Sequence, residues 1–166
     1  GNHSKEAFKA IDDIGFGFIA SARNSTQKDL LHVPRDKFKK IILPITGKTV
    51  EYYKITRKIY KVKRTIYVTL DPAKHKKHVH LFEKKLEEKV SKIEEYFKNR
   101  LNVKKWQKLK KKKKKLKTMI GRNPFKSIIE YSITGTEGNL SLAISINKTE
   151  REKYVETLGR SILFTN

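Results

Sequence analysis

The chain has 166 residues, and its 40 Lys and Arg outnumber its 17 Asp and Glu, which gives a formal net charge of +23 at pH 7. Cysteine is absent, which excludes disulfides, thiolate zinc sites and cysteine nucleophiles. Nothing resembles a signal peptide, and no apolar run reaches the roughly 18 residues that a membrane-spanning helix needs. We therefore expect an intracellular protein with one patterned core, or a small core with an appended arm.

The positive charge is concentrated in one part of the chain. Residues 72–123 carry 20 Lys and Arg against 5 Asp and Glu, whereas residues 124–166 carry 5 of each kind. Ten of the fourteen residues from Lys104 to Lys117 are lysine. Charge this dense repels itself, so the pattern predicts a polyanionic partner such as a phosphate backbone. The neutral last quarter argues against a uniformly basic, ribosomal type of chain.

The first 46 residues predict one helix, one strand and an irregular stretch. Ser4 is a candidate N-cap for a short helix that places Phe8 and Ile11 on one face. The small and apolar run at 15–22 predicts a strand buried on both sides. Residues 24–46 contain two prolines and are expected to be irregular.

Two β-rich runs, at 49–59 and 63–70, predict a hairpin. Ile66, Val68 and Leu70 alternate with polar residues on the second run, as expected for a strand with one buried face. The first run places three apolar residues on one face: Tyr53, Ile55 and Ile59. The turn at Tyr60–Val62 has neither Gly nor Asn, so the register of the hairpin stays open.

Residues 72–121 predict a basic helical arm. Asp71 followed by Pro72 is typical of a helix start. An apolar stripe follows at spacings of three and four: Phe82, Leu86, Val90, Ile93, Phe97 and Leu101. We expect this stripe to face a second helix through Trp106 and Leu109. A break near 99–102 leaves two alternatives, a helical hairpin or a broken long helix.

The lysine run lies in the second half of this arm. Because like charges one turn apart destabilise an isolated helix, we expect Lys110–Lys115 to be frayed until an anion binds. A solvated tail is the alternative interpretation. Trp106 and the apolar spacing around it favour an ordered helix. There is no recognition-helix pattern of Arg, Asn or Gln, so we expect contacts to phosphates rather than to base edges.

These arguments give two sets of candidate phosphate contacts. The first set is Lys104, Lys105, Lys108, Lys110, Lys111, Lys112, Lys113, Lys114, Lys115 and Lys117. The second set, on the predicted hairpin, is Arg57, Lys58, Lys61, Lys63 and Arg64.

The last segment returns to strands. Residues 128–133 and the strictly alternating run at 140–146 flank a turn and predict a second hairpin. Thr149–Glu152 has the spacing of a capping box before a short helix. Gly159 precedes a final apolar strand at 160–165.

Residue clusters that could carry catalysis are weak. His75, His78 and His80 are close enough for a metal site, but no Cys or carboxylate completes the ligand set, and a solvated helix start is the preferred interpretation. Asp12 and Asp13 are adjacent, so their side chains diverge on a helix. No P-loop, nucleophile elbow or Ser-His-Asp pattern occurs.

Short motifs stand at both ends of the chain. They are Gly1–Phe8, Phe18–Arg23, Gln27–Leu31 and Gly159–Asn166. Together they resemble the DDE transposases of prokaryotic insertion sequences, in the subgroup whose second catalytic aspartate lies in an Asp-x-Gly-Asn motif. Gly1 and Asn2 match the tail of that motif, and the last strand resembles the one before the catalytic-glutamate helix. Glu156 and Thr157 depart from the aspartate-rich turn that is usual there.

The resemblance implies an α+β fold in three parts. Residues 1–23 and 159–166 would be elements of a ribonuclease-H-like core. Residues 24–158 would form an antiparallel, β-rich insertion domain, with the basic helical hairpin arm at about 72–121. Such insertions are implied to hold transposon-end DNA.

The resemblance also implies a division of labour. The complete transposase would use Mg²⁺ or Mn²⁺, held by three carboxylates, to cut and join DNA strands during DNA transposition. None of those carboxylates is in this chain, so we expect a DNA-binding fragment that is catalytically incomplete alone and has no cofactor of its own. We expect it in the prokaryotic cytoplasm, associated with the nucleoid and away from membranes. The complete protein is a possible homodimer.

Two rival functions come from other classes. The first is a structural RNA- or nucleoid-binding protein that clamps nucleic acid with the helical hairpin. The second is a nuclease whose site uses Asp12, Asp13 and a histidine.

Overall fold

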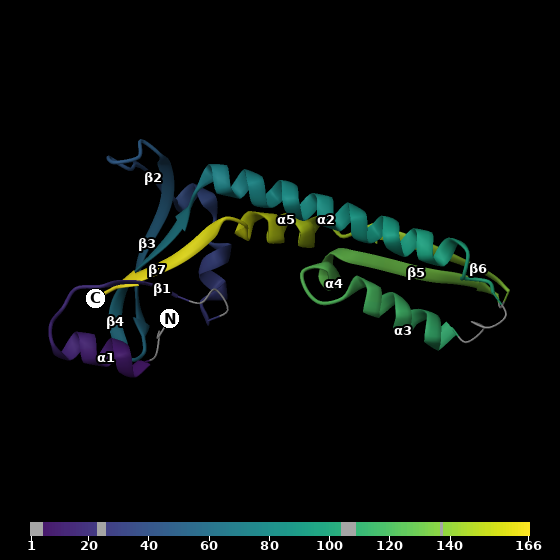
Figure 1. Ribbon diagram of the computed structural model, residues 1–166, viewed down its shortest axis with the longest axis horizontal. Coiled ribbons are helices and arrows are strands. Elements are labelled where there is room, and N and C mark those ends of the chain that lie inside the picture. Colours follow the sequence, from purple (N-terminus) through teal and green to yellow (C-terminus); the bar gives the residue numbers. More distant parts are fainter. Residues whose placement is uncertain (1–4, 23–25, 104–108, 137) are drawn as a thin grey trace. The chain divides into compact units, whose positions relative to one another are not determined.

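The computed structural model describes residues 5–22, 26–103, 109–136 and 138–166 (Figure 1). It is a mixed α+β structure with two antiparallel sheets. The chain divides into two compact units. We call residues 1–78 with 157–166 the sheet unit, and residues 79–156 the arm unit.

The sheet unit is built on five strands in the order β1-β7-β4-β3-β2. Their bounds are β1 Ile19–Ser21, β2 Lys39–Ile42, β3 Thr49–Ile59, β4 Val62–Leu70 and β7 Arg160–Thr165. The last strand of the chain, β7, lies between β1 and β4 and is antiparallel to both. Its alternating burial, with Ile162 and Phe164 inside, explains the apolar residues of the predicted terminal strand.

The β3–β4 hairpin confirms the predicted pairing and supplies its register. Ile59 pairs with Val62, so the turn is the two residues Tyr60 and Lys61. Both have positive φ, 52° and 69°, as a turn that matches the right-handed twist of the strands requires. Neither residue is of the type that favours this conformation, which is why the sequence left the register open.

One face of this sheet carries the core of the sheet unit. Helix α1 (Lys5–Asp13) and the 3₁₀ helix η2 (Lys28–His32) supply buried side chains to the other side, and a second 3₁₀ helix, η3 (Arg35–Lys37), follows η2 in the chain. Buried side chains from helix and sheet meet there: Phe8, Ala20, Leu30, Ile59, Ile66, Val68, Ile162 and Phe164. The strand expected at 15–22 is shorter, because only 19–21 pairs with β7 and Ile19 remains 78% exposed. The expectation of burial on both sides was therefore wrong.

The arm unit contains most of α2 (Pro72–Lys98), then α3 (Leu109–Ile120), α4 (Phe125–Ile128), β5 (Ile129–Thr136), β6 (Asn139–Ile146) and α5 (Lys148–Thr157). Asp71 caps α2, since its Oδ1 accepts hydrogen bonds from the Ala73 and Lys74 backbone N–H groups at 2.9 and 3.1 Å. The predicted break is confirmed, because α2 ends at Lys98 and a separate α3 follows. The cap of α5 is Asn147 rather than a box at Thr149, because Asn147 Oδ1 accepts from Glu150 N–H at 3.0 Å.

The apolar stripe of α2 faces two different partners. Towards its start, the Phe82 ring lies 5.8 Å from Phe125 and 4.9 Å from Tyr154. Further along, Lys89 Nζ donates to the Met119 carbonyl at 2.9 Å, so α3 lies beside this part of α2. The expectation that Leu109 would receive the stripe was wrong, since that side chain is 39% exposed. Trp106 lies outside the described residues.

The division into units differs from the expected boundaries at 24 and 158. The compact units change over after His78 and after Glu156. The reason is the long-range pairing of β4 with β7, which joins residues 49–70 to the sheet that contains β1. The second compact unit therefore begins within α2.

Candidate nucleic-acid interface

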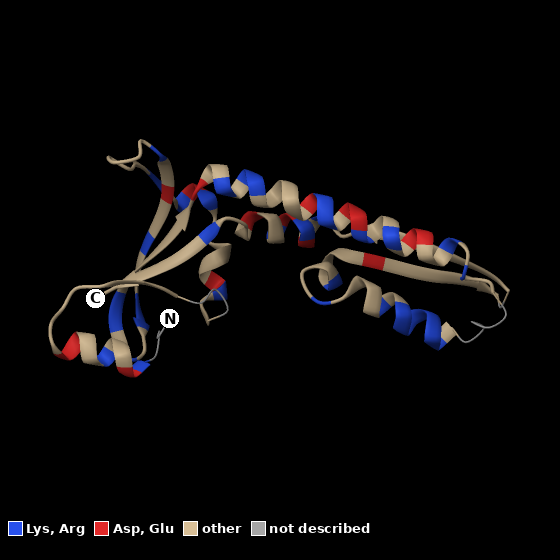
Figure 2. Cartoon of the chain, viewed as in Figure 1, with Lys and Arg blue, Asp and Glu red and all other residues tan. Residues whose placement is uncertain are grey.

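Helix α3 displays most of its lysines on the surface. Its buried side is a single row at a spacing of four, made of Lys112, Leu116 and Ile120. Five lysines of the helix are exposed: Lys110, Lys111, Lys113, Lys114 and Lys117. Figure 2 shows that α3 carries Lys and no acidic residue, whereas Lys and Glu are interspersed on α2.

The helix forms despite its charge because burial outweighs repulsion. A like-charge pair one turn apart costs about 0.2–0.5 kcal/mol, and the helix has a few such pairs. Burying Leu116 and Ile120, which are 0% and 3% exposed, contributes about 1.5–3 kcal/mol each. Lys110–Lys115 were expected to be frayed without an anion. In the structure they are helical, within the run from Leu109 to Ile120.

Lys112 is a correction to the first candidate set. It is 2% exposed, and its Nζ donates a hydrogen bond to the Leu101 carbonyl, in the stretch after α2. A buried ammonium needs such an acceptor, so Lys112 fastens α3 to the end of the preceding helix and cannot reach a phosphate. Lys115 is half-buried, with its Nζ 5.1 Å from the centre of the Tyr96 ring. Lys104, Lys105 and Lys108 lie outside the described residues.

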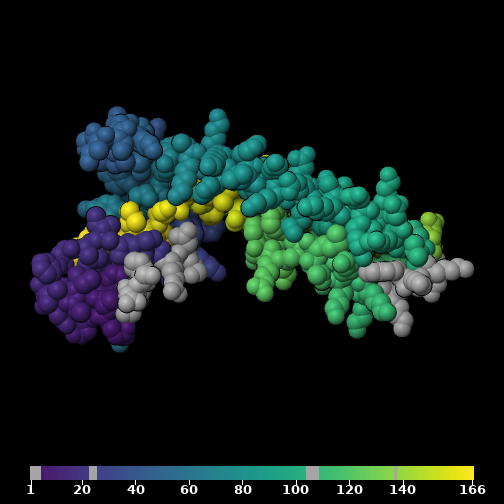
Figure 3. Space-filling view, in the orientation of Figure 1, coloured from purple at the N-terminus to yellow at the C-terminus, as the bar shows by residue number. Residues whose placement is uncertain are grey.

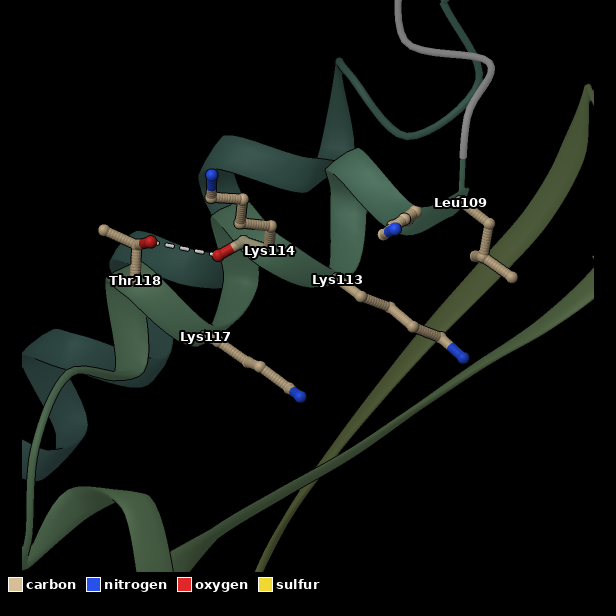
Figure 4. A pocket seen from close by; sticks show the side chains of 6 residues that line it. Leu109, Lys113, Lys114, Lys117 and Thr118 are labelled. Carbon is tan, nitrogen blue, oxygen red and sulfur yellow. Dashed lines mark hydrogen bonds between the residues drawn. The ribbon is translucent and has the colours of Figure 1, made fainter.

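An open hollow of about 710 Å³ runs along the exposed side of α3. Lys110, Lys113, Lys114 and Lys117 line it, together with Leu109 and Thr118. In the close-up, Lys113 and Lys117 point to the same side of the helix, and the Thr118 hydroxyl donates to the Lys114 carbonyl at 3.0 Å (Figure 4). The space-filling view shows the side chains of α3 as separate projections from the surface (Figure 3).

A second hollow continues from the end of α3. Lys117 borders both, and the second adds Arg122 and Lys126 over a floor that includes Ile129 and Tyr131. No carboxylate lines either hollow among the described residues. Sequence reasoning missed Arg122 and Lys126. The sequence feature that could have indicated them is Gly121, which ends the helix. A chain that turns back after a helix places the next cations beside the last helical turn.

The second candidate set, on the β3–β4 hairpin, separates into two groups. Arg64 is 1% exposed and donates to both Asp12 carboxylate oxygens, at 3.1 and 2.5 Å, so it is a structural residue and its assignment as a DNA contact is corrected. Arg57 is paired with Asp29 at 2.7 Å, and its hydrogen bond holds the pKa of that carboxyl below its usual value. Lys58, Lys61 and Lys63 are exposed.

Three residues of the weak catalytic clusters, His75, Asp12 and Asp13, bond other parts of the fold. His75 Nδ1 lies 2.7 Å from the Leu158 carbonyl and donates to it, since a carbonyl only accepts. Asp12 binds Arg64, and Asp13 binds Lys9 at 2.7 Å. Within the described ranges, no group of three or more His, Cys, Asp or Glu could hold a metal ion. The described side chains therefore do not fit the two-metal centre of a transposase.

No protein-family model, curated protein or solved structure matches this chain. None of the described helices combines the length and apolar character needed to cross a membrane.

Proposed function

We propose that this chain binds DNA through the exposed lysine side of α3 and the adjoining Arg122 and Lys126. The observation that carries the proposal is the sorting of charge on α3. Five lysines of α3 face solvent, and four of them, Lys110, Lys113, Lys114 and Lys117, line a hollow with no carboxylate among the described residues. The buried Lys112 serves packing instead. A surface of this kind attracts a polyanion and has no acid to repel it.

The dimensions of α3 fit a run of phosphates. Its 12 residues rise about 18 Å along the axis. Phosphates on one strand of duplex DNA are about 3.4 Å apart along its axis, so the helix passes about five of them. Five exposed lysines are enough to neutralise that number. The exposed side of α3 has no Arg, Asn or Gln to read base edges, so we expect binding that tolerates any sequence.

We further propose that the chain is the DNA-positioning part of a DDE transposase. Supporting this are the end motifs described above, the α+β fold, and a basic arm that forms a compact unit of its own. In that setting the arm unit would hold transposon-end DNA while carboxylates elsewhere in the protein perform the chemistry. The ribonuclease-H-like nature of the sheet unit is part of the same proposal.

The test is a salt titration of duplex binding with DNA and RNA probes of equal length. Five to seven phosphate contacts predict that log K falls with log salt at a slope of about −4.5 to −6. Equal affinity for unrelated DNA sequences is expected. A flat salt dependence would contradict the electrostatic account. Clear preference for duplex RNA would favour the rival structural RNA-binding function, because A-form duplexes are recognised by shape and 2′-hydroxyl contacts.

A further inference from the structure

The sheet of the sheet unit has a second face, opposite its core. Tyr53, Ile55 and Ile59 of β3 point to the core, so the alternating residues Tyr52, Lys54, Thr56 and Lys58 point the other way. The register places Thr69, Tyr67, Thr65 and Lys63 of β4 directly opposite them. Ser161, Leu163 and Thr165 of β7 continue the same face on the next strand. We call this the outer face.

The charged residues of the strands are sorted between the two faces. Glu51 is the sole acidic residue in the five strands; it shares the inner side with Tyr53 and Ile55 and bonds Arg35 at 2.7 Å. Arg57, Arg64 and Arg160 are on the inner side as well, where they bond Asp29, Asp12 and the Leu31 and Val33 carbonyls. The outer face carries lysine and no carboxylate: its cations are Lys39, Lys54, Lys58 and Lys63. All four are exposed.

Two aromatic rings lie among these lysines. Tyr52 and Tyr67 are half-exposed, and their ring centres are 6.2 Å apart at an interplanar angle of 52°. Lys54 Nζ is 5.8 Å from the centre of the Tyr67 ring. The rest of the central surface is hydroxyl-bearing, with Thr56, Thr65 and Thr69. Cations beside exposed rings on a platform of hydroxyls are the combination that holds phosphates and stacks bases together.

The half-exposed rings of this face distinguish its ligand from that of α3. The bases of a duplex are stacked inside it, so a ring on a sheet can stack only on a base that is unpaired. A helix with projecting lysines has no such requirement, because it reaches phosphates alone. Charge complementarity therefore selects a nucleic acid for the outer face, and the exposed rings select a single strand.

We propose that the outer face binds an unpaired strand of DNA, with its phosphates at Lys54, Lys58 and Lys63 and its bases stacked on Tyr52 and Tyr67. The choice of DNA rests on the proposed function. The site itself is independent of α3, because its residues belong to the other compact unit. This makes the chain a binder of two DNA forms, a duplex on the arm unit and a single strand on the sheet unit.

The experiment measures binding of the whole chain to a fluorescent 12-nucleotide thymidine oligomer, a mixed-sequence DNA duplex and an RNA 12-mer. Losing a base stack costs roughly five- to 150-fold in affinity. Tyr52→Ala and Tyr67→Ala should therefore each lower the affinity for the single strand by a factor in that range. Tyr52→Phe and Tyr67→Phe keep the ring and should bind within about twofold of the parent. Duplex affinity should be unchanged in all four variants.

Each outcome decides the proposal. Single-strand affinity that survives both alanine changes in folded protein overturns it, as does a tighter Tyr-dependent complex with RNA than with DNA. If an alanine variant fails to fold, the triple change Lys54→Gln, Lys58→Gln and Lys63→Gln decides instead, since these side chains are exposed. The triple variant should bind the single strand at least tenfold more weakly than the parent, and an unchanged affinity overturns the proposal. If the unmodified chain does not bind duplex DNA, the α3 proposal alone is contradicted. Failure of the α3 proposal and failure of the outer-face proposal are therefore distinguishable.

Discussion

The buried arginines of the sheet unit and the exposed lysines of α3 in the arm unit use their positive charge in opposite ways. In the sheet unit the buried cations are arginines, and Arg64 and Arg160 bond a carboxylate or backbone carbonyls under the sheet. In the arm unit, α3 holds one lysine inside and leaves five exposed, four of which line a hollow that has no acidic residue among those the structure describes. The comparison teaches that net charge alone does not locate a binding surface. What matters is whether a cation already has a partner within the fold.

The largest effect on stability should come from breaking the Arg64–Asp12 pair. Removing one partner of a buried ion pair costs about 3–5 kcal/mol, and the lower end applies because the Asp12 side chain is 21% exposed. We expect Arg64→Ala to lower the free energy of unfolding of the sheet unit by about 3 kcal/mol, as measured by urea denaturation. The neighbouring Lys63→Ala should change it by less than about 0.5 kcal/mol. Equal effects would show that Arg64 is not the structural residue described here.

A smaller effect is expected within α3 itself. Lys112→Ala would leave the Leu101 carbonyl without its donor, at a cost of about 1–3 kcal/mol in unfolding free energy. Lys113→Ala, one position along the same helix, should leave stability unchanged within about 0.5 kcal/mol and weaken DNA binding instead. Urea denaturation and duplex binding of both variants test this exchange of roles. The comparison fails if Lys112→Ala weakens DNA binding more than Lys113→Ala in folded protein.

The pH dependence of the sheet unit should report the Arg35–Glu51 pair. The Arg35 hydrogen bonds lower the pKa of the Glu51 carboxyl, and two of them measure 2.7 and 2.8 Å. A lowered folded-state pKa means that the stabilisation is complete above the ordinary glutamate pKa of about 4.3 and is lost as pH falls through the lower folded value. Between pH 6 and 3, the melting temperature of Glu51→Gln should therefore fall less steeply than that of the parent. Parallel curves would show that the pair contributes nothing.

The smallest expected effect is that of a single exposed lysine on DNA binding. Lys113→Gln removes one phosphate contact, so the slope of log K against log salt should become shallower by about 0.9. The matched change Lys84→Gln, on the exposed side of α2, should leave the slope unaltered. A full titration from 50 to 300 mM salt resolves a difference of this size. Identical slopes for the two variants would argue that α3 is not a focused surface.

Local signals in the sequence predicted elements better than they predicted the roles of charged residues. Asp71-Pro72 placed the start of α2 correctly, because capping depends on residues within one turn. The register of the β3–β4 hairpin could not be predicted, since Tyr60 and Lys61 adopt positive φ without the usual residue types. The pairing of β7 with β4 was also out of reach. It joins residues about a hundred positions apart, and no turn specifies it.

The two misassigned cations did carry a signal. Arg64 has the same parity as Ile66, Val68 and Leu70 on β4, which places it on the buried face. Lys112 precedes Leu116 by four residues, which places it on the buried row of α3. Applying the period of each element to its charged residues, and not only to its apolar ones, would have removed both from the candidate contacts. The sequence could not show which acceptors they bind, because Asp12 and the Leu101 carbonyl arrive through tertiary packing.

The most direct test of the account compares two five-lysine variants that lose the same charge. One carries Gln at Lys110, Lys111, Lys113, Lys114 and Lys117 of α3, and the other at Lys74, Lys76, Lys77, Lys84 and Lys98 of α2, all ten being exposed. Duplex DNA binding is measured against salt for both. Five lost contacts predict that the α3 variant loses about 4.5 from its salt slope, whereas the α2 variant stays near the parent. Equal losses in the two variants would contradict the claim that α3 is the binding surface.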